Sequence, residues 1–275
     1  MTIKFNLLKR YAPTTNGLRH IIKIDKTSLL KDSKIIKSLK IKKTVTNGRS
    51  TMFGNITAWH RGGGHKQRKR LLDTPFTEQL NVVLGTSYNP NRSTFNTIFF
   101  DLLSKKIHAR LGSENLYPGT LTKTTETLTE FNSGNRSMIK SIPIGTLIHN
   151  IILPNQTKPK YINSAGTFGQ IIKTNPKISI IKLPSNKLLR IDSTATATIG
   201  INTNSKHNQQ QLGKAGVNRA LNRRPITRGI AMNPVDHPHG GRTNGGRPSV
   251  SPWGLPTKCG FYLKRRSKKN KKNYE

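Results

Sequence analysis

Basic residues far outnumber acidic residues in this chain. Its 275 residues include 48 lysines and arginines but only 11 aspartates and glutamates, which gives a formal net charge of +37. A compact protein with that excess repels itself unless a polyanion neutralises it. Nucleic acid is the polyanion that fits best, because each phosphate neutralised by a cation also releases condensed counterions. The sequence therefore predicts a nucleic-acid-binding protein.

An anionic membrane surface is the alternative polyanion. It would call for an amphipathic basic helix or a lipidation signal, and the sequence has neither. No apolar run approaches the ~20 residues that a membrane span needs. We therefore expect no membrane span.

The positive charge is concentrated in the second half of the chain. Beyond Phe131 only Asp192, Asp236 and Glu275 are acidic, against 25 lysines and arginines in the same stretch. Apolar residues make up 32% and aromatic residues 6% of the chain. These fractions are low for a globular protein, which predicts that part of the chain lacks a core of its own.

Short β-branched and aromatic runs predict a mainly-β fold. "NVVLGTSY" and "FNTIFFDLL" are separated by the turn signal Asn89–Ser93. A second group of such runs spans residues 137–203 and includes a hairpin with Pro184-Ser185-Asn186 at its tip. Closely spaced short strands indicate small barrels or sandwiches, so we expect two small β domains in tandem.

The two ends of the chain lack such patterns. Residues 1–50 alternate lysine with isoleucine and leucine, which indicates either a solvated tail or a basic arm laid along RNA. Regular pattern also stops near Asn204, and only a short helix from Lys214 to Asn222 is predicted beyond it. A coil that long is expected to be ordered by a partner, since it has too few apolar residues to fold alone.

The glycine-rich string "WHRGGGHKQRKR" (Trp59–Arg70) is one candidate phosphate-binding segment. It sets three successive glycines among basic side chains. A backbone without Cβ atoms can approach a phosphate closely while the flanking cations bind it. The spacing does not match a P-loop, and a flexible basic loop is the structural alternative.

"NPVDHPHGGRTNGGRPSVSPWG" (Asn233–Gly254) is the second candidate segment. A metal site at His237 and His239 lacks a third ligand at a supporting spacing, and catalysis lacks a nucleophile in a recognisable setting. We therefore expect neither catalytic nor metal-binding residues. Pro234 and Pro238 stiffen the peptide, while its arginines can bind phosphates and its histidines and tryptophan can stack on unpaired bases. The segment is predicted to thread between RNA helices.

The same segment carries a family resemblance. "RGIAMNPVDHPHGG" (Arg228–Gly241), followed by "GGRPSVSPWG", closely resembles the ribosomal large-subunit protein L2 (uL2) family. Other strings occur in the family's order, and the resemblance covers nearly the whole chain. These strings are "APTTNGLRH" (12–20), "GNITAWHRGGGHKQ" (54–67), "YNPNRS" (88–93), "SIPIGTLIHNI" (141–151), "SAGTFGQII" (164–172) and "LGKAG" (212–216).

The resemblance implies an OB-fold barrel followed by an SH3-like barrel, between long irregular basic extensions that penetrate the large-subunit rRNA. The expected domains are a basic N-terminal extension at 1–50, an OB-fold RNA-binding domain at 51–133, an SH3-like barrel at 134–203 and an rRNA-penetrating C-terminal extension at 204–275. It implies a structural constituent of the large ribosomal subunit, not an enzyme, that supports subunit association and the architecture near the peptidyl transferase centre.

The expected partners are large-subunit rRNA, neighbouring ribosomal proteins and the small subunit across the interface. No cofactor is expected beyond Mg²⁺ associated with the rRNA. The residues predicted to contact rRNA are Arg19, His20, His60, Arg61, Gly62, Gly63, Gly64, His65, Lys66, Arg68, Asn91, Arg92, Lys214, Arg219, Arg224, Arg228, Asn233, His237, His239, Gly240, Gly241, Arg242, Arg247 and Trp253.

The expected location is the mitochondrion, with a plastid or the bacterial cytoplasm as alternatives. The family's N-terminal motif begins by about Tyr11, which leaves almost no room for a cleaved transit peptide. The isoleucine, lysine and asparagine bias favours the mitochondrial alternative. A single cysteine, Cys259, excludes an internal disulfide framework.

Two functions from other classes compete with the ribosomal one. A free protein that compacts nucleic acid would explain the charge but would not need "NPVDHPHGG". A metal-dependent hydrolase would use the histidines but lacks a ligand set and a nucleophile.

Overall fold

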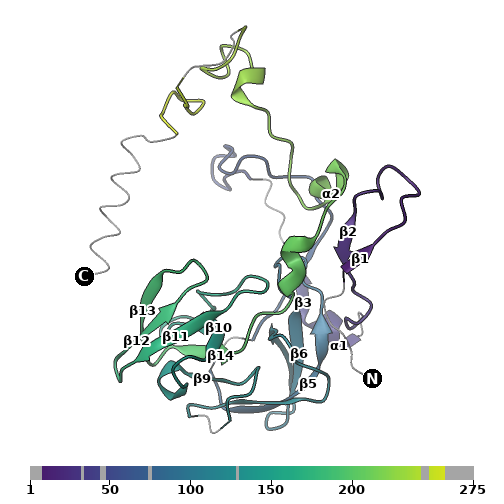
Figure 1. Cartoon of the computed structure of the whole chain (residues 1–275). Coiled ribbons are helices and arrows are strands. Elements are labelled where there is room, and N and C mark those ends of the chain that lie inside the picture. The colour runs from purple at the N-terminus through teal and green to yellow at the C-terminus, as the bar shows by residue number, and fades with distance from the viewer. Residues whose placement is uncertain are drawn as a thin grey trace. The chain divides into compact units, whose positions relative to one another are not determined.

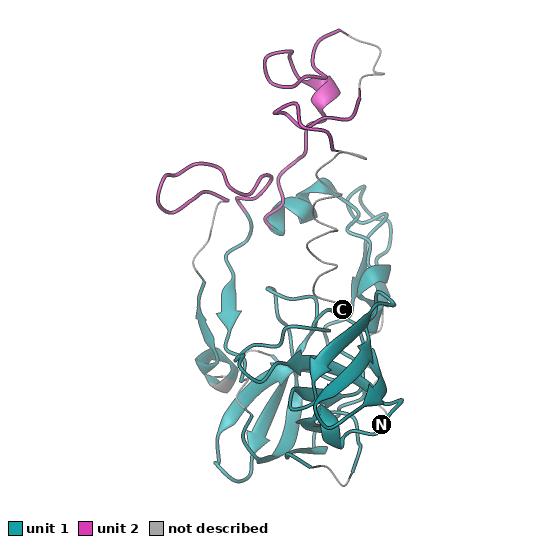
Figure 2. Ribbon diagram, turned by 90° about the vertical axis from the view of Figure 1, so that its left-hand side faces the viewer, with its two compact units in different colours: residues 1–46, 64–221 teal, residues 47–63, 222–275 magenta. Residues whose placement is uncertain are grey.

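The structure of this protein is a computed structural model that divides by its contacts into two compact units (Figure 2). Unit 1 comprises residues 1–46 and 64–221, and unit 2 comprises residues 47–63 and 222–275. Arg247, Cys259 and the basic run that ends the chain lie outside the described residues. The structure describes residues 8–31, 34–43, 48–73, 76–127, 130–242 and 248–257.

Within the described part of unit 1, one ten-stranded sheet holds two consecutive groups of strands (Figure 1). Its order is β13-β12-β11-β10-β14-β9-β8-β5-β6-β7. The first group is β5 (Gln79–Ser87), β6 (Asn96–Asp101), β7 (Ile107–Leu111) and β8 (Leu121–Thr124). The second group is β9 (Arg136–Met138), β10 (Leu147–Ile152), β11 (Gly169–Thr174), β12 (Ile178–Lys182), β13 (Leu188–Asp192) and β14 (Thr196–Ile199).

The two groups are joined by a short parallel pairing. Thr124 of β8 pairs with Arg136 of β9, whereas every other named strand pair in the sheet is antiparallel among the described residues. A 3₁₀ turn, η1 (Ile139–Ser141), follows β9 directly.

The first group bends around a small core. Val83, Phe99 and Leu116 pack together there. The register of β5 against β6 shifts between Val83 and Gly85, and Gly85 has a φ of +145°, which a residue with a Cβ rarely adopts. This bulge curves the strand, as expected where a sheet closes on itself.

The second group has a larger core made mostly of isoleucine. Ile139, Ile148, Ile151 and Ile181 are all fully buried in it. Burying one such side chain contributes roughly 1.5–3 kcal/mol, so this cluster supplies much of the stability of unit 1. Isoleucine also suits the pleated strands that carry it, because its branched side chain packs well on a sheet.

The first fifty residues contain more helix and strand than the irregular extension that was expected there. They include the antiparallel pair β1 (Leu8–Arg10) and β2 (Ile22–Ile24) and the short helix α1 (Lys34–Ser38). Ile24 and Leu29 pack with Phe95, next to the start of β6. In addition, β3 (Lys40–Lys42) pairs antiparallel with β4 (Arg68–Arg70).

The segment that follows the barrels is built from short turns, as its composition predicts. It contains η2 (Ser205–Gln209), α2 (Ala215–Ala220) and η3 (Gly229–Ala231), and none of the three holds a buried residue. The predicted helix at 214–222 is confirmed by α2, which is slightly shorter.

The predicted mainly-β fold is confirmed, while the predicted division into two tandem β domains stays a prediction. The turn at 89–93 joins β5 to β6, and the tip at 184–186 joins β12 to β13. Among the described residues, no helix has the length and apolar character to cross a membrane.

Candidate nucleic-acid interface

Two basic segments that are distant in sequence run side by side in unit 2. The backbone N–H of Arg224 donates to the carbonyl of His60 at 3.0 Å, and that of Gly62 donates to the carbonyl of Asn222 at 3.3 Å. An isolated antiparallel bridge joins Arg61 to Arg223 between them. The pairing brings together the cations of the glycine-rich loop and those of the C-terminal segment.

The glycines of this loop have the backbone freedom that the sequence predicted. Gly62 and Gly63 have φ values of +140° and +72°, and a Cβ added at Gly63 would meet nothing within 4 Å. The space beside Gly63 is therefore open, so a phosphate can approach its backbone. His60 also has a positive φ, and its Nδ1 lies 3.1 Å from the carbonyl oxygen of Pro225.

In unit 1, the basic run continues from Gly64 into β4 and faces a second basic strand. The β3–β4 pair sets Lys40 opposite Arg70 and Lys42 opposite Arg68. Like charges placed directly opposite on a sheet destabilise it, so the exposed pair of Lys42 and Arg68 is repulsive and would favour a polyanion. We define the β3–β4 pair, Lys40–Lys42 with Arg68–Arg70, as the basic ribbon.

The basic ribbon was only partly predicted. Arg68 was named as an RNA contact, whereas the lysines of β3 were covered only by the expectation that residues 1–50 form a solvated tail or a basic arm laid along RNA. The period of two in that short string was the one available signal of a strand. His65 is placed beside α2 by its backbone N–H, which donates to the carbonyl of Ala220 at 3.0 Å.

The turn between β5 and β6 supports the basic ribbon. The Asn91 amide donates to the carbonyl of Arg68 at 2.9 Å, and the Lys43 ammonium donates to Asn91 Oδ1 at 2.7 Å. Asn91 therefore helps to position the basic ribbon, and its expected contact with RNA stays a prediction. Arg92 is exposed, although partial desolvation lowers the pKa of its guanidinium.

Four further predicted residues lie elsewhere in unit 1, on a turn, just before α2 or on α2. Ile22 and Gln211 exchange backbone hydrogen bonds of 3.0 and 2.9 Å. These bonds bring the exposed turn that ends in Arg19 and His20 near Lys214, whose stem lies beside Gly17. Arg219 is exposed on α2.

The loop from Arg228 to Gly241 folds around the ring of His237, which is only 7% exposed. The backbone N–H of His239 donates to His237 Nδ1 at 3.0 Å. A Cβ added at Gly229 would lie 2.6 Å from that ring, so only glycine permits this approach. His237 is thus an organising residue of the loop, and little of its ring is left for the base stacking expected of it.

Backbone bonds close the same loop around His237. Asn233 accepts through its carbonyl from the N–H groups of Asp236 and His237 at 3.0 and 3.2 Å. The N–H of Gly240 donates to the backbone carbonyl of His237 at 2.8 Å, and that of Gly241 donates to the backbone carbonyl of Met232 at 3.1 Å. The loop therefore has a defined local fold.

Charged side chains are exposed on this loop and at its end, and they include the acidic Asp236. Arg228 and Arg242 are exposed, while Arg247 lies outside the described residues. His239 Nε2 lies 2.8 Å from the carbonyl oxygen of Pro248, and its ring lies 4.8 Å from that of His237.

Two exposed tryptophans in unit 2 form a platform on which bases could stack. The Trp59 and Trp253 rings meet edge to face with centroids 6.1 Å apart. They are 57% and 67% exposed, and such amphipathic rings readily stack on unpaired bases. Trp253 was among the predicted RNA contacts, whereas Trp59 was not.

The histidines and acidic residues that the structure describes do not gather into a metal site. No group of three histidine, cysteine or acidic side chains within them could hold a metal ion. Ser113 and His149 make a 2.6 Å hydrogen bond, but both are buried, and no substrate can reach them. Burial lowers the pKa of His149 to about 4, so its ring is neutral.

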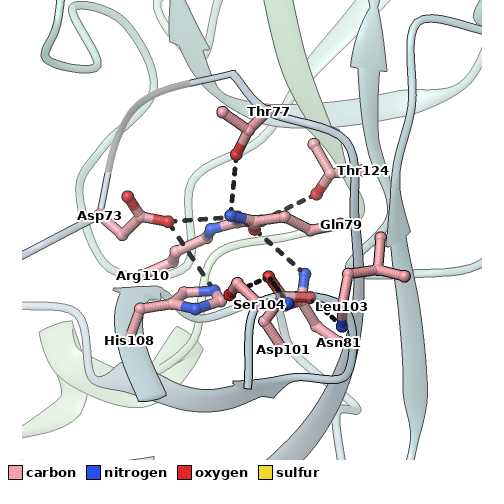
Figure 3. Close-up of polar contacts among 10 residues, drawn as sticks. All are labelled: Asp73, Thr77, Gln79, Asn81, Asp101, Leu103, Ser104, His108, Arg110 and Thr124. Carbon is pink, nitrogen blue, oxygen red and sulfur yellow. Dashed lines mark hydrogen bonds and ion pairs between the residues drawn. The ribbon is translucent and has the colours of Figure 1, made fainter. Parts of the chain in front are cut away.

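Two acidic side chains, Asp73 and Asp101, make their contacts within the first group of strands and the segment before it. Asp73 accepts from Arg110 at 3.3 Å, and Asp101 accepts from Ser104 and from the backbone of Leu103 (Figure 3). His108 lies beside Asp73, and burial followed by the charge of Arg110 lowers its pKa to about 4. These carboxylates hold the first group of strands together and do not neutralise the surface cations.

Comparison with known proteins identifies relatives along most of the chain. A family model described as "Ribosomal Proteins L2, RNA binding N-terminal domain" matches residues 36–120, and "Ribosomal Proteins L2, C-terminal domain" matches residues 132–254. The chain is 40% identical to the large ribosomal subunit protein uL2m of Reclinomonas americana, over 92% of each chain. It is 38% identical to uL2 of Methylorubrum extorquens, over 91% of each, and 36% identical to uL2 of Rhodospirillum rubrum, over 96% of this chain and 94% of the relative.

Proposed function

Because this chain belongs to the ribosomal protein L2 family, and is thus a structural, RNA-binding protein of the large ribosomal subunit, we propose that it fixes large-subunit rRNA near the peptidyl transferase centre and supports joining of the small subunit. The proposal adds to the family assignment a position near the peptidyl transferase centre and a role in subunit joining. Its expected partners are the large-subunit rRNA, neighbouring ribosomal proteins and, across the interface, the small subunit.

The observation that carries this proposal is the self-repulsion of the basic ribbon. Lys42 faces Arg68 across it, and the carboxylates Asp73 and Asp101 make internal contacts. Facing cations weaken a strand pair, and phosphates lying over them would remove that cost. A structural RNA-binding role explains why the chain places cations opposite one another at some cost in stability. An enzyme or a spacer would have no need of this arrangement.

The loop around His237 supports an architectural role near the catalytic RNA. Its ring is buried by Gly229 and its Nδ1 is occupied by the backbone N–H of His239. A general base must instead reach the proton that it removes. We therefore propose that His237 shapes the loop that meets the rRNA and takes no part in peptide-bond chemistry.

The proposed location is the mitochondrial large subunit, and the expected Mg²⁺ is bound by the rRNA and not by a site of this chain. The composition bias of the sequence and the likeness to the uL2m protein support the location. Fractionation of the source cells with an antibody to this chain tests it. Recovery in a plastid fraction or in bacterial cytoplasm would contradict it.

Binding of the full chain to rRNA transcripts tests the proposed function. We expect tight, salt-dependent binding to large-subunit rRNA and weaker binding to small-subunit rRNA of the same length. Half a dozen phosphate contacts would lower the affinity about a thousandfold between roughly 50 and 200 mM salt. A flat salt response, or equal affinity for both transcripts, would argue for non-specific binding.

A further inference from the structure

A cleft of about 580 Å³ lies beside the basic ribbon in unit 1. It is bounded by α1 and the basic ribbon, by the turn that follows β5, and by α2. Small-ligand pockets have volumes of roughly 300–1,000 Å³, so the cleft can hold a compound of nucleotide size.

One side of the cleft is cationic. Lys37, Lys66, Arg68 and Arg70 line it, and no acidic side chain is among the described residues that do so. Lysine and arginine in this density bind phosphate, arginine through two parallel hydrogen bonds.

The other side is apolar and aromatic. Tyr88, which is 40% exposed, lies there with Pro90 from the same turn and Leu221 from the end of α2. The ammonium of Lys26 lies 3.5 Å from the centre of the Tyr88 ring and covers one of its faces. This cation–π contact holds the ring, and the exposed part of Tyr88 is the surface that it offers to a base.

Hydrogen bonds fix the walls relative to one another, so the cleft is formed before a ligand enters. Asn91 joins the Tyr88 turn to the basic ribbon through the carbonyl of Arg68, at 2.9 Å. Asn89 Oδ1 accepts from the backbone N–H of Asn91 at 2.9 Å and stiffens the turn. The backbone bond from His65 to Ala220 joins the start of β4 to α2.

We propose that this cleft binds a single unstacked nucleotide of RNA, with its base against Tyr88 and its phosphate against Arg68 and Lys66; the inference rests on the proposed rRNA-binding function. A duplex backbone presents only phosphates and sugars and would leave the apolar side of the cleft unused. An unpaired nucleotide uses both sides, because proteins recognise such bases by stacking them on aromatic rings. The cleft thus selects a bulged or looped-out position of the rRNA.

Photocrosslinking of the full chain tests this site. The probe is a single-stranded hexanucleotide with one 4-thiouridine, compared with the same strand in a duplex, and the adducts are mapped by mass spectrometry. We expect the single strand to give adducts in the segment that contains Tyr88, and the duplex to give few there. Stacking on an aromatic ring is worth about five- to 150-fold in affinity, so Tyr88→Ala should lower the adduct yield in that segment at least fivefold.

Matched variants separate the site from general basic binding. Tyr117→Ala removes a tyrosine of nearly equal exposure, 42%, that does not line the cleft, and should leave the adducts unchanged. Tyr88→Phe keeps the ring and should retain them, while Arg68→Gln should reduce them without removing the ring. Circular dichroism shows whether each variant is folded. If Tyr88→Ala unfolds, the adduct yields of Tyr88→Phe and Arg68→Gln show whether the cleft binds the nucleotide.

Two results distinguish failure of this inference from failure of the proposed function. If the chain binds large-subunit rRNA but the single-strand adducts lie only outside the cleft, or match those of the duplex, the cleft is not a nucleotide site. If the chain shows no preference for large-subunit rRNA, the proposed function itself is wrong, and the inference that rests on it is withdrawn.

Discussion

Replacing Lys42 with glutamate should stabilise the isolated protein while weakening its binding to rRNA. Lys42 is exposed and faces Arg68 across the basic ribbon, so the change converts a repulsive pair into an attractive one. Cross-strand charge pairs are worth roughly 0.2–1 kcal/mol, and solvent screening keeps exposed pairs near the lower end. Because the change removes a repulsion and adds an attraction, each near the lower end of that range, we expect the free energy of unfolding to rise by about 0.4–1 kcal/mol.

The same substitution should weaken rRNA binding by reducing the electrostatic contribution to the affinity. Loss of one phosphate contact lowers the slope of log affinity against log salt by about 0.7–0.9. Urea denaturation of the isolated protein and filter binding of large-subunit rRNA at several salt concentrations measure the two effects. Lys187→Glu is the control, because it makes the same change in net charge at the exposed hairpin tip between β12 and β13.

Two results would refute this reasoning. If Lys42→Glu lowers the stability of the protein, the facing cations are not repulsive in the folded chain. If Lys42→Glu and Lys187→Glu weaken rRNA binding equally, the effect comes from net charge and not from the basic ribbon.

Three further predictions follow from the described geometry. Lowering the pH from 6.5 to 4 should destabilise the fold, because His108 and His149 are held neutral with pKa values of about 4, whereas the unfolded chain takes up their protons from pH 6.5 downward. Urea denaturation should show a smaller acid-induced loss in His149→Gln, and an equal loss would contradict the assignment. Gly229→Ala should disrupt the loop around His237, because the new Cβ would lie 2.6 Å from the ring, and limited proteolysis should cut there faster; Gly216→Ala, whose Cβ meets nothing within 4 Å, is the neutral control. His237→Gln should impair assembly of large subunits but leave most puromycin reactivity in each assembled particle, and near-complete inactivity in particles of normal composition would restore a catalytic role.

Local sequence signals predicted the parts of the fold that depend on neighbouring residues. The turn at 89–93, the hairpin tip at 184–186 and the helix near 215–220 are each specified by turn residues or by a short favourable run. The family strings likewise predicted which basic and glycine-rich segments would form the candidate interface. These features need no knowledge of distant partners.

The parts that were not predicted depend on contacts between distant segments. Lys42 becomes part of a charged ribbon only because β3 pairs with a strand that begins at Arg68, 26 residues later in the sequence. The burial of His237 depends on the close approach of Gly229 and on a bond from the backbone of His239. Composition shows that such residues are basic or polar, but it does not show which of them stabilise the fold and which contact RNA.

Sedimentation of the native protein through a sucrose gradient tests the central claim most directly. At high Mg²⁺ the chain should migrate with whole ribosomes, and at low Mg²⁺ it should move entirely with the large subunit when the subunits separate. Release of the chain at the top of the gradient, or its equal distribution between both subunits and other nucleic acid, would contradict an architectural role in the large ribosomal subunit.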